Sequence, residues 1–334
     1  MLHALDTGSY VEPSNLLVRD YMQQWLDTMR GQVSPKSHER YEEIVNGFIA
    51  PALGSHKLTR LMPGHIQAAY SDWEKGGRRD GKGGGLSART RLHIHRILNS
   101  ALKAAVKIQI LARNPAEAVN APKPTRKDIS ALDAAQSVQL LTAIRQTRMY
   151  VPVLLALATG MRRGEIMALR WKHVDFDKKA VRVVESLEQT RKGLRFKPPK
   201  NDKVRVVSLP AYAVEELQRH KADQTEAFLK LGIALDGNTL VYSHYDGSPI
   251  LPNSLTHQFR RFVRNMKNFP AICFHDLRHT HATELLRSGI HPKVAQERLG
   301  HSSISVTFDI YSHVTETMQA DAAAKIDAVL RGVG

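Results

Sequence analysis

Apolar residues recur at helical spacing through the first third of the chain. From Leu17 to Met29 they lie four residues apart, on one face of a helix. Ser34-Pro35 then supplies an N-cap and a first-turn proline for a helix that runs to about Ile49. Two more helices are expected over about residues 65–74 and 87–109, the longer with a basic side formed by Arg89, Arg91, His93, Arg96, Lys103 and Lys107. The pattern predicts an all-helical N-terminal domain.

The second half of the chain has a mixed pattern. Helices are expected at about residues 133–146 and 150–158, and helical spacing resumes from Val214 and dominates from Ser254 to the end. Between them, three short segments have the composition of β-strands: Ala180–Glu185, Arg195–Lys197 and Val204–Leu209. This pattern predicts a mainly α domain that contains a small antiparallel β-sheet.

A proline-rich, basic stretch separates the two halves and is typical of an interdomain linker. The expected organisation is a tail at 1–14, a helical domain at 15–122, a linker at 123–130 and the mixed domain at 131–334.

The charge balance of the chain indicates a polyanionic partner. Lys and Arg number 48 against 32 Asp and Glu, which gives a formal net charge of +16. No apolar run reaches membrane-spanning length and the first residues do not resemble a signal peptide, so we expect nucleic acid and no membrane. Aromatic residues make up only 6%, which favours duplex DNA over a single strand. The single cysteine, Cys273, excludes an internal disulfide and agrees with a cytoplasmic location.

Two motifs suggest a bound phosphate or metal, but each departs from the pattern that such a site requires. Gly76, Gly81 and Lys82 fit part of a P-loop, but Gly83 replaces its Ser or Thr, and the preceding segment is helical in pattern. His275 and His279 have zinc-ligand spacing, but Arg278 lies between them and would repel a cation. The sequence therefore predicts neither a cofactor nor a metal.

Candidates for each role in phosphoryl transfer are nevertheless present. Arg162 lies at a turn between two expected helices, and His275 and Arg278 lie three residues apart on another. His301 follows a glycine, and Tyr311 comes ten residues later. Lysines 197, 200 and 203 lie around an expected hairpin turn. Each residue alone has an ordinary structural explanation, so their order along the chain carries the argument.

In that order the motifs resemble the tyrosine recombinase, or phage integrase, family over nearly the whole chain. The segment 159–165 (TGMRRGE) is similar to the first arginine box, and 275–280 (HDLRHT) matches the H-x-x-R box. The segments 299–305 and 311–314 match the final box, and 199–201 before the strand 204–209 is similar to the lysine-bearing hairpin.

The resemblance implies a DNA breaking-rejoining fold, in which the N-terminal helices form a core-binding domain. It also implies a set of catalytic residues: Arg162, Lys200, His275, Arg278, His301 and the nucleophile Tyr311. Glu165 would support Arg162 as a buried carboxylate, and Lys197 or Lys203 stays an alternative to Lys200.

The implied reaction is site-specific recombination that integrates or excises a phage or other mobile element. Tyr311 would become linked to the 3′ side of the scissile phosphate, in a homotetramer on duplex DNA that needs neither ATP nor metal. The apolar segment from Glu316 to Val333 would dock on a neighbouring protomer. A host-factor or excisionase protein is a further expected partner.

Two other functions fit parts of the pattern. A type IB topoisomerase would use similar residues to relax DNA without pairing sites. A non-enzymatic DNA-binding regulator would explain the charge alone, but it leaves the order of the six candidate residues as coincidence.

Overall fold

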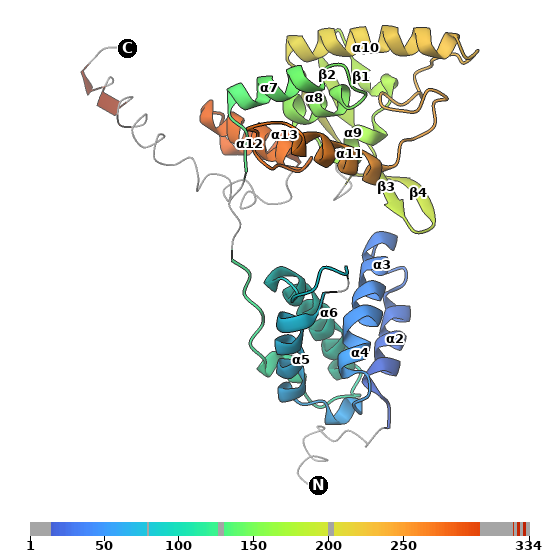
Figure 1. The fold of residues 1–334 in the computed structure, drawn as a ribbon, viewed down its shortest axis with the longest axis vertical. Helices are drawn as coiled ribbons and strands as arrows, with labels where there is room; N and C mark the ends of the chain where they lie inside the picture. Colours follow the sequence, from blue (N-terminus) through green and yellow to red (C-terminus); the bar gives the residue numbers. More distant parts are fainter. Residues whose placement is uncertain are drawn as a thin grey trace. The chain divides into compact units, whose positions relative to one another are not determined.

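The computed structural model of the chain describes residues 15–78, 80–125, 130–199 and 204–300, together with 323, 326, 327, 330 and 331. They belong to two compact units, Met1–Lys127 and Asp128–Gly334 (Figure 1). The predicted site residues Lys200, His301 and Tyr311 lie outside the described residues. The predicted domain limits, 15–122 and 131–334, stay a prediction.

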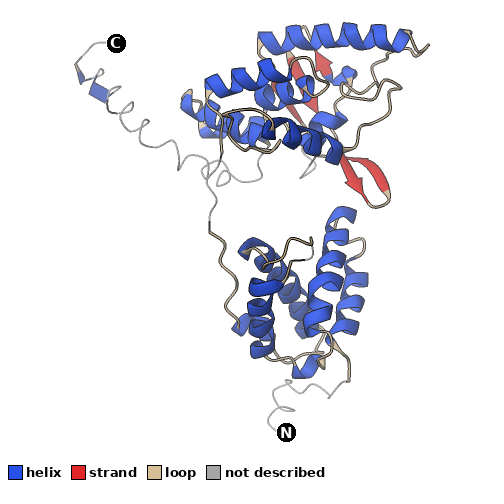
Figure 2. Ribbon diagram, viewed as in Figure 1, coloured by secondary structure: helices blue, strands red, loops and turns tan. Residues whose placement is uncertain are grey.

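The described part of the N-terminal unit is built from helices alone (Figure 2). Its α-helices are α2 (Val18–Met29), α3 (Pro35–Ile44), α4 (Ala50–Leu53), α5 (Pro63–Gly76) and α6 (Ala88–Lys107). They pack around one apolar core, in which Met22, Ile44 and Leu98 are fully buried. Among the described helices of the whole chain, none has the length and apolar character needed to cross a bilayer.

The helix predicted to run from Ser34 to Ile49 is interrupted near its end. Ser34 caps α3 by accepting a hydrogen bond from the Ser37 amide, as its position before Pro35 suggests. The chain then makes a π-helical turn over Val45–Ile49 before α4 begins. Pro51 has no N–H to donate to the carbonyl four residues earlier, which explains why the α-helical ladder does not continue unbroken.

The basic side predicted for the long helix α6 is narrower than expected. Arg89, Arg96, Lys103 and Lys107 are exposed. Arg91 instead binds the Glu74 carboxylate with its side chain only 12% exposed, because α5 packs against this part of α6.

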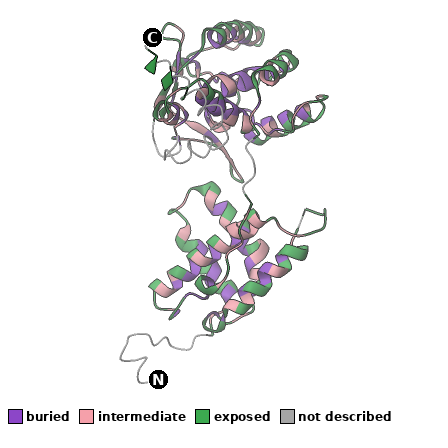
Figure 3. Ribbon diagram, turned by 90° about the vertical axis from the view of Figure 1, so that its left-hand side faces the viewer, coloured by how far each residue is buried: buried purple, intermediate pink, exposed green. Residues whose placement is uncertain are grey.

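The described helices of the C-terminal unit begin with α7 (Ala134–Ile144) and the apolar α8 (Tyr150–Thr159). The others are α9 (Arg163–Ala168), α10 (Ala211–Leu229), α11 (Pro252–Arg264), α12 (Asp276–Arg287) and α13 (Pro292–Leu299). Helix α8 is buried along most of its length and packs against α7, α9, α10 and α12. Figure 3 shows buried residues gathered in the interior of this unit. Helix α8 is therefore the centre around which these four helices are arranged.

Two small antiparallel sheets complete this unit. Strands β1 (Val174–Asp175), β2 (Ala180–Val183) and β5 (Arg205–Ser208) form one sheet, in which β2 is central. Strands β3 (Ser186–Thr190) and β4 (Gly193–Lys197) form a separate hairpin (Figure 2). The sequence pattern missed β3, because its five residues include a single large apolar side chain, Leu187. The predicted strand at 204–209 pairs with β2 and not with the neighbouring β4.

Gly160 lets three helices meet at the end of α8. It adopts the left-handed conformation, with φ of +65°, and ends that helix. A Cβ at this position would lie 2.6 Å from Leu299 Cδ2 and 2.7 Å from His281 Cδ2. The lack of a side chain therefore allows α12 and α13 to approach the end of α8.

We expect Gly160→Ala to lower the free energy of unfolding by about 2–4 kcal/mol, through backbone strain and overpacking together. Gly232→Ala is the matched control, because Gly232 has φ of +69° and nothing within 4 Å of its Cβ position. The control variant should lose only about 1–2 kcal/mol. Calorimetric unfolding of both variants checks this, and equal losses would contradict the close approach at Gly160.

Candidate active site

Arg162 lies where the sequence placed it, at the turn between two helices. Gly160 ends α8, and Arg162 is the N-cap residue of α9, with an extended backbone. Its amide donates to Glu165 Oε2 at 2.8 Å and its Nη1 donates to Glu165 Oε1 at 2.9 Å. The first turn of α9 therefore holds the guanidinium in place, while its side chain remains 25% exposed.

Glu165 is a buried carboxylate with two arginine partners. Its side chain is only 1% exposed, and Arg205 on β5 binds it in a fork at 3.0 and 2.6 Å. Burial opposes ionisation, but the hydrogen bonds and charge of Arg205, together with Arg162, lower the pKa of Glu165 below its ordinary value. The carboxylate is therefore ionised at neutral pH, and it connects α9 to β5.

Arg278 points inward from the first turn of α12. Its Nη1 donates to the Gly160 carbonyl at 2.6 Å and its Nη2 to the Leu299 carbonyl at 2.7 Å. Burial and the positive charge of Arg162 lower the pKa of Arg278 to about 9, so the guanidinium stays protonated at neutral pH. These bonds place Arg278 beside Arg162 and Glu165.

His275 immediately precedes α12 and its ring packs edge-on against His279, with ring centroids 5.0 Å apart. The residue is exposed to solvent. Surrounding protein atoms nevertheless partly desolvate its ring, and this effect, together with the charges of His279 and Arg278, lowers the pKa of His275. The His275 imidazole is therefore neutral at neutral pH and can accept a proton.

The end of α13 approaches the same cluster through its main chain. Gly300, with φ of +66°, ends the helix, and its carbonyl accepts a hydrogen bond from Arg162 Nη2 at 2.9 Å. Arg162 is thus bound to the residue that ends α13. Sequence reasoning brought Arg162 and Arg278 into one site, and the structure places both there.

Sequence reasoning missed two further residues that support this cluster, His281 and Arg298. His281 Nδ1 contacts the Leu157 carbonyl at 2.7 Å, so this nitrogen carries the proton, and Nε2 accepts from Arg298 Nε at 3.1 Å. Burial and the charge of Arg298 lower the pKa of His281 to about 4. The H-x-x-R motif ends three residues before His281, and the mostly polar sequence around both residues gives no sign that they form a buried pair.

Of the three candidate lysines, the structure describes Lys197. Lys197 ends β4 and its Nζ binds Glu188 Oε1 across the hairpin. Lys200 and Lys203 lie outside the described residues. Lys197 is therefore already bound to a carboxylate.

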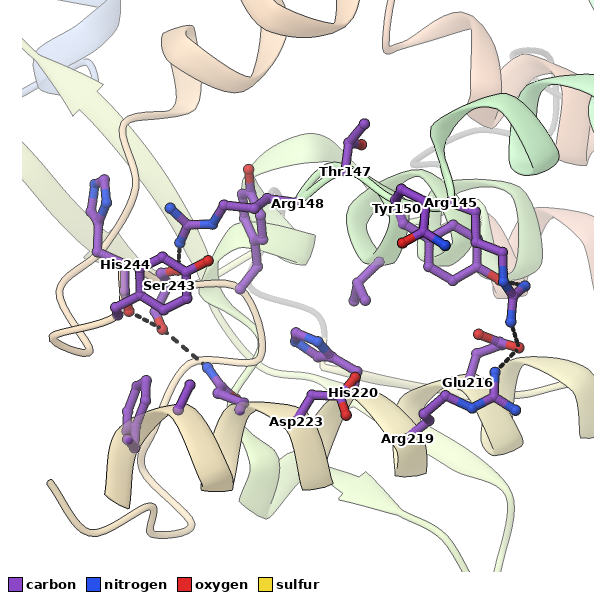
Figure 4. A pocket seen from close by; sticks show the side chains of 17 residues that line it. Arg145, Thr147, Arg148, Tyr150, Glu216, Arg219, His220, Asp223, Ser243 and His244 are labelled. Atoms are coloured by element: carbon purple, nitrogen blue, oxygen red, sulfur yellow. Dashed lines mark hydrogen bonds and ion pairs between the residues drawn. The ribbon is translucent and has the colours of Figure 1, made fainter. Parts of the chain in front are cut away.

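A well-defined cavity lies elsewhere in the described part of the C-terminal unit. A cavity of about 410 Å³ is formed by the loop between α7 and α8, by α10 and by residues 242–245 (Figure 4). Arg145 and Arg219 both bind Glu216 at its edge, and Arg148 lies over the ring of Tyr245. It shares no lining residue with the arginine cluster. Across the described ranges, no group of three or more His, Cys, Asp or Glu side chains is arranged to hold a metal ion.

Family models match both units. Residues 130–318 match the phage integrase family, and residues 17–73 match the phage integrase N-terminal SAM-like domain. The chain belongs to the phage integrase family. The predicted family is thereby confirmed, and so is the predicted activity of the enzyme as a tyrosine-type site-specific DNA recombinase.

Similar proteins cover most of the recombinase. The tyrosine recombinase XerC-like protein of Caldanaerobacter subterraneus is 27% identical, over 98% of this chain and 86% of that protein. The ICEBs1 integrase of Bacillus subtilis is 29% identical, over 74% of this chain and 67% of its own length. The Tn1549 transposon integrase, solved with a circular intermediate DNA, has a TM-score of 0.78 at 21% identity, over 93% and 99% of the two chains. The predicted fold class is confirmed.

The buried His281 should make the recombinase less stable in mild acid. Between about pH 4 and 6.5 the imidazole is neutral in the folded protein and protonated in the unfolded chain. The unfolded chain then binds more protons, so the free energy of unfolding falls as the pH is lowered through this range, by about 3 kcal/mol.

We expect His281→Gln to reduce the pH dependence of the free energy of unfolding by about 3 kcal/mol over this range, because a glutamine amide keeps a donor and an acceptor but does not titrate. Urea unfolding at several pH values between 4 and 7 measures the effect. His244→Gln, at an exposed loop position, is the control. An unchanged pH profile for His281→Gln would argue against a neutral buried imidazole.

Proposed function

We propose that this recombinase binds duplex DNA, cuts it at a specific site through a 3′-phosphotyrosyl bond to Tyr311, and rejoins it. The reaction would integrate or excise a phage or other mobile element. The observation that carries the proposal is the cluster of Arg162, Arg205 and Arg278 around Glu165. Relatives named as integrases, among them a transposon integrase solved with DNA, support the same substrate.

The charge of the cluster suits a scissile phosphodiester. Arg162 and Arg205 bind the single carboxylate of Glu165 and Arg278 lies nearby, so positive charge is in excess beside Gly300. Two of the five side-chain N–H groups of Arg162 donate to Glu165 Oε1 and to the Gly300 carbonyl. Because the side chain is partly exposed, its other N–H groups can donate to an anion that binds from outside. Planar guanidinium groups stay charged and donate paired hydrogen bonds to non-bridging oxygens.

The proposed cleavage step needs neither ATP nor metal, because every bond broken and every proton transferred is accounted for by the protein and the DNA. Tyr311 Oη forms a bond to phosphorus as the bond between phosphorus and the 5′-oxygen breaks. The phenol proton passes to the neutral His275, whose pKa the bound phosphate would raise, and Lys200 protonates the leaving 5′-oxygen. His301 adds a third donor to the phosphate. Attack by a 5′-hydroxyl on the phosphotyrosine reverses every transfer and rejoins the strand.

The contacts of Lys197 support Lys200 as the general acid. The Lys197 ammonium binds Glu188, whose other oxygen is buried and without a hydrogen-bond partner. A proton donor held by a partly unsatisfied carboxylate is less available to a leaving oxygen. Lys200 precedes β5, the strand that carries Arg205.

Recombination requires protomers that communicate, and we propose a homotetramer on the DNA, with a host-factor or excisionase protein as a further partner. The segment from Glu316 to Val333 would dock on a neighbouring protomer. Two of its described residues, Ile326 and Leu330, are 60% and 80% exposed in the single chain. A neighbour's groove would cover these apolar side chains.

Tyr311→Phe should abolish covalent protein–DNA adducts and leave duplex binding close to that of the parent, because only the nucleophilic oxygen is lost. A duplex with a nick near the cut site traps the adduct, and a denaturing gel measures it. An adduct formed by the Phe variant would show that Tyr311 is not the nucleophile.

The products of the reaction distinguish the three candidate functions. A recombinase gives recombinant products from paired sites, whereas a type IB topoisomerase only relaxes the DNA. An absence of any cleavage would indicate a regulator.

Lys200→Ala should slow cleavage by about 10²–10⁴-fold, because the leaving 5′-alkoxide is strongly basic and needs a proton. A substrate with sulfur at the bridging 5′ position does not need that proton, so the variant should cut it almost as fast as the parent. Single-turnover rates on both substrates test this.

Lys197→Ala is the matched control, since Lys197 lies in the same region and binds Glu188. Arg162→Ala should stay slow on both substrates, because the non-bridging oxygens are unchanged. Sulfur rescue of Lys197→Ala or of Lys203→Ala in place of Lys200→Ala would assign the general acid to that lysine.

A further inference from the structure

Arg205 contacts two separate parts of the site, although its sequence context marks it only as a strand residue. Its Nη1 and Nη2 bind the two oxygens of Glu165, the carboxylate that also holds Arg162. Its Nε donates to the main-chain carbonyl of Arg298 at 3.0 Å. The Arg205 side chain is only 10% exposed. One buried guanidinium therefore binds both α9 and the end of α13.

The last carbonyls of α13 are each bound by a different arginine. The Arg298 carbonyl accepts from Arg205, the Leu299 carbonyl from Arg278, and the Gly300 carbonyl from Arg162. Carbonyls at a helix C-terminus lack partners within the helix and carry partial negative charge. The three arginines thus fix the point at which the chain leaves α13 for residue 301.

Gly300 brings the main chain into contact with Arg205. A Cβ at Gly300 would lie 3.2 Å from both Cδ and Nη1 of Arg205. The guanidinium is therefore packed against the chain immediately before residue 301, as well as hydrogen-bonded to it two residues earlier. A change in the position of Arg205 would move this segment.

We propose that Arg205 is a positioning residue for strand cleavage. Through Glu165 it sets the orientation of Arg162, and through the Arg298 carbonyl it holds the end of α13, which comes directly before His301 in the sequence. The inference rests on the proposed function, in which Arg162 contacts the scissile phosphate. Arg205 itself touches neither DNA nor the reacting atoms in this account.

Only arginine can make this set of contacts. Its planar fork reaches two carboxylate oxygens and leaves Nε for a third acceptor in a different direction. Lysine keeps the charge and much of the length, but its ammonium is a single point that cannot serve both sites with the same geometry. Arg205→Lys therefore removes the positioning while keeping a positive charge beside buried Glu165.

The first test compares cleavage with binding. We expect Arg205→Lys to lower the single-turnover rate on a nicked suicide duplex by about 10–100-fold, because a displacement near 1 Å is enough for such a loss. Its affinity for the duplex should stay close to that of the parent. A cleavage rate equal to that of the parent would overturn the proposal.

Arg145→Lys is the matched control. Arg145 donates to the buried Glu216, which also binds Arg219, so this cluster reproduces two arginines on one carboxylate away from the site (Figure 4). We expect this variant to cleave at the parent rate. A comparable loss in the control would show that any disrupted arginine–carboxylate cluster slows cleavage, and the proposal would fall.

The second test separates positioning from partial unfolding. A methylphosphonate at the scissile position replaces one non-bridging oxygen by a methyl group and removes the negative charge that Arg162 would face. If Arg205 acts through Arg162, the deficit of Arg205→Lys should be several-fold smaller on this substrate. A smaller fraction of folded enzyme would instead give the same deficit on both substrates, which would overturn the proposal.

The double variant Arg162→Ala/Arg205→Lys provides an independent measure. Relative to Arg162→Ala, its cleavage rate should fall by clearly less than the loss that Arg205→Lys causes in the parent, because there is no Arg162 guanidinium left to orient and only the contact with the end of α13 remains to be lost. Full additivity of the two losses would show that Arg205 does not act through Arg162.

If Arg205→Lys does not fold, Arg205→Gln, which keeps a planar donor group, takes its place in both tests. Cleavage by the parent and its loss in Tyr311→Phe establish the proposed function separately, so the two ideas fail by different results.

Discussion

The buried carboxylate of Glu165 is the constraint on which the arrangement of the site depends. Removing a carboxylate from water costs on the order of several kcal/mol, and an isolated one would be protonated or expelled. Glu165 is instead bound by the Arg162 amide, the Arg162 side chain and both ends of the Arg205 fork. Because all four donors must converge on one group, the start of α9 and the strand β5 have little freedom relative to each other.

The apolar packing around α8 determines where that carboxylate can lie. Helix α8 is nearly continuous in apolar residues and is surrounded by helices, so its end is fixed within the core. Gly164 then brings α9 against β3, since a Cβ there would lie 2.5 Å from Ser186 Oγ. Arg163 extends the arrangement to α11 through a hydrogen bond to Thr256. Ordinary hydrophobic burial thus supplies the rigid frame, and the charged groups occupy one edge of it.

The sequence predicted the local features of this site better than its connections. The turn at Gly160 and Arg162 was visible, because an apolar helix ends at a glycine and another helix begins directly afterwards. The hairpin strand β3 was not, since Ser186–Thr190 has neither strong β-forming composition nor two apolar positions in alternation. Arg205 was read as a strand residue, because a single sequence does not show that a partner 40 positions away is buried against it. The roles of Lys200, His301 and Tyr311 stay predictions, as these residues lie outside the described part of the chain.

The arginine contacts at the end of α13 have a consequence for comparing related sequences. Three guanidinium groups bind the main-chain carbonyls of residues 298–300, and every amino acid has such a carbonyl. Substitution of Arg298 or Leu299 would leave these acceptors in place, so no compensating change at Arg205 or Arg278 would be selected on their account. Covariation between positions should therefore reveal the pairing of Arg205 with Glu165 but not its attachment to α13. The contacts that attach α13 to the site therefore leave no record in paired substitutions.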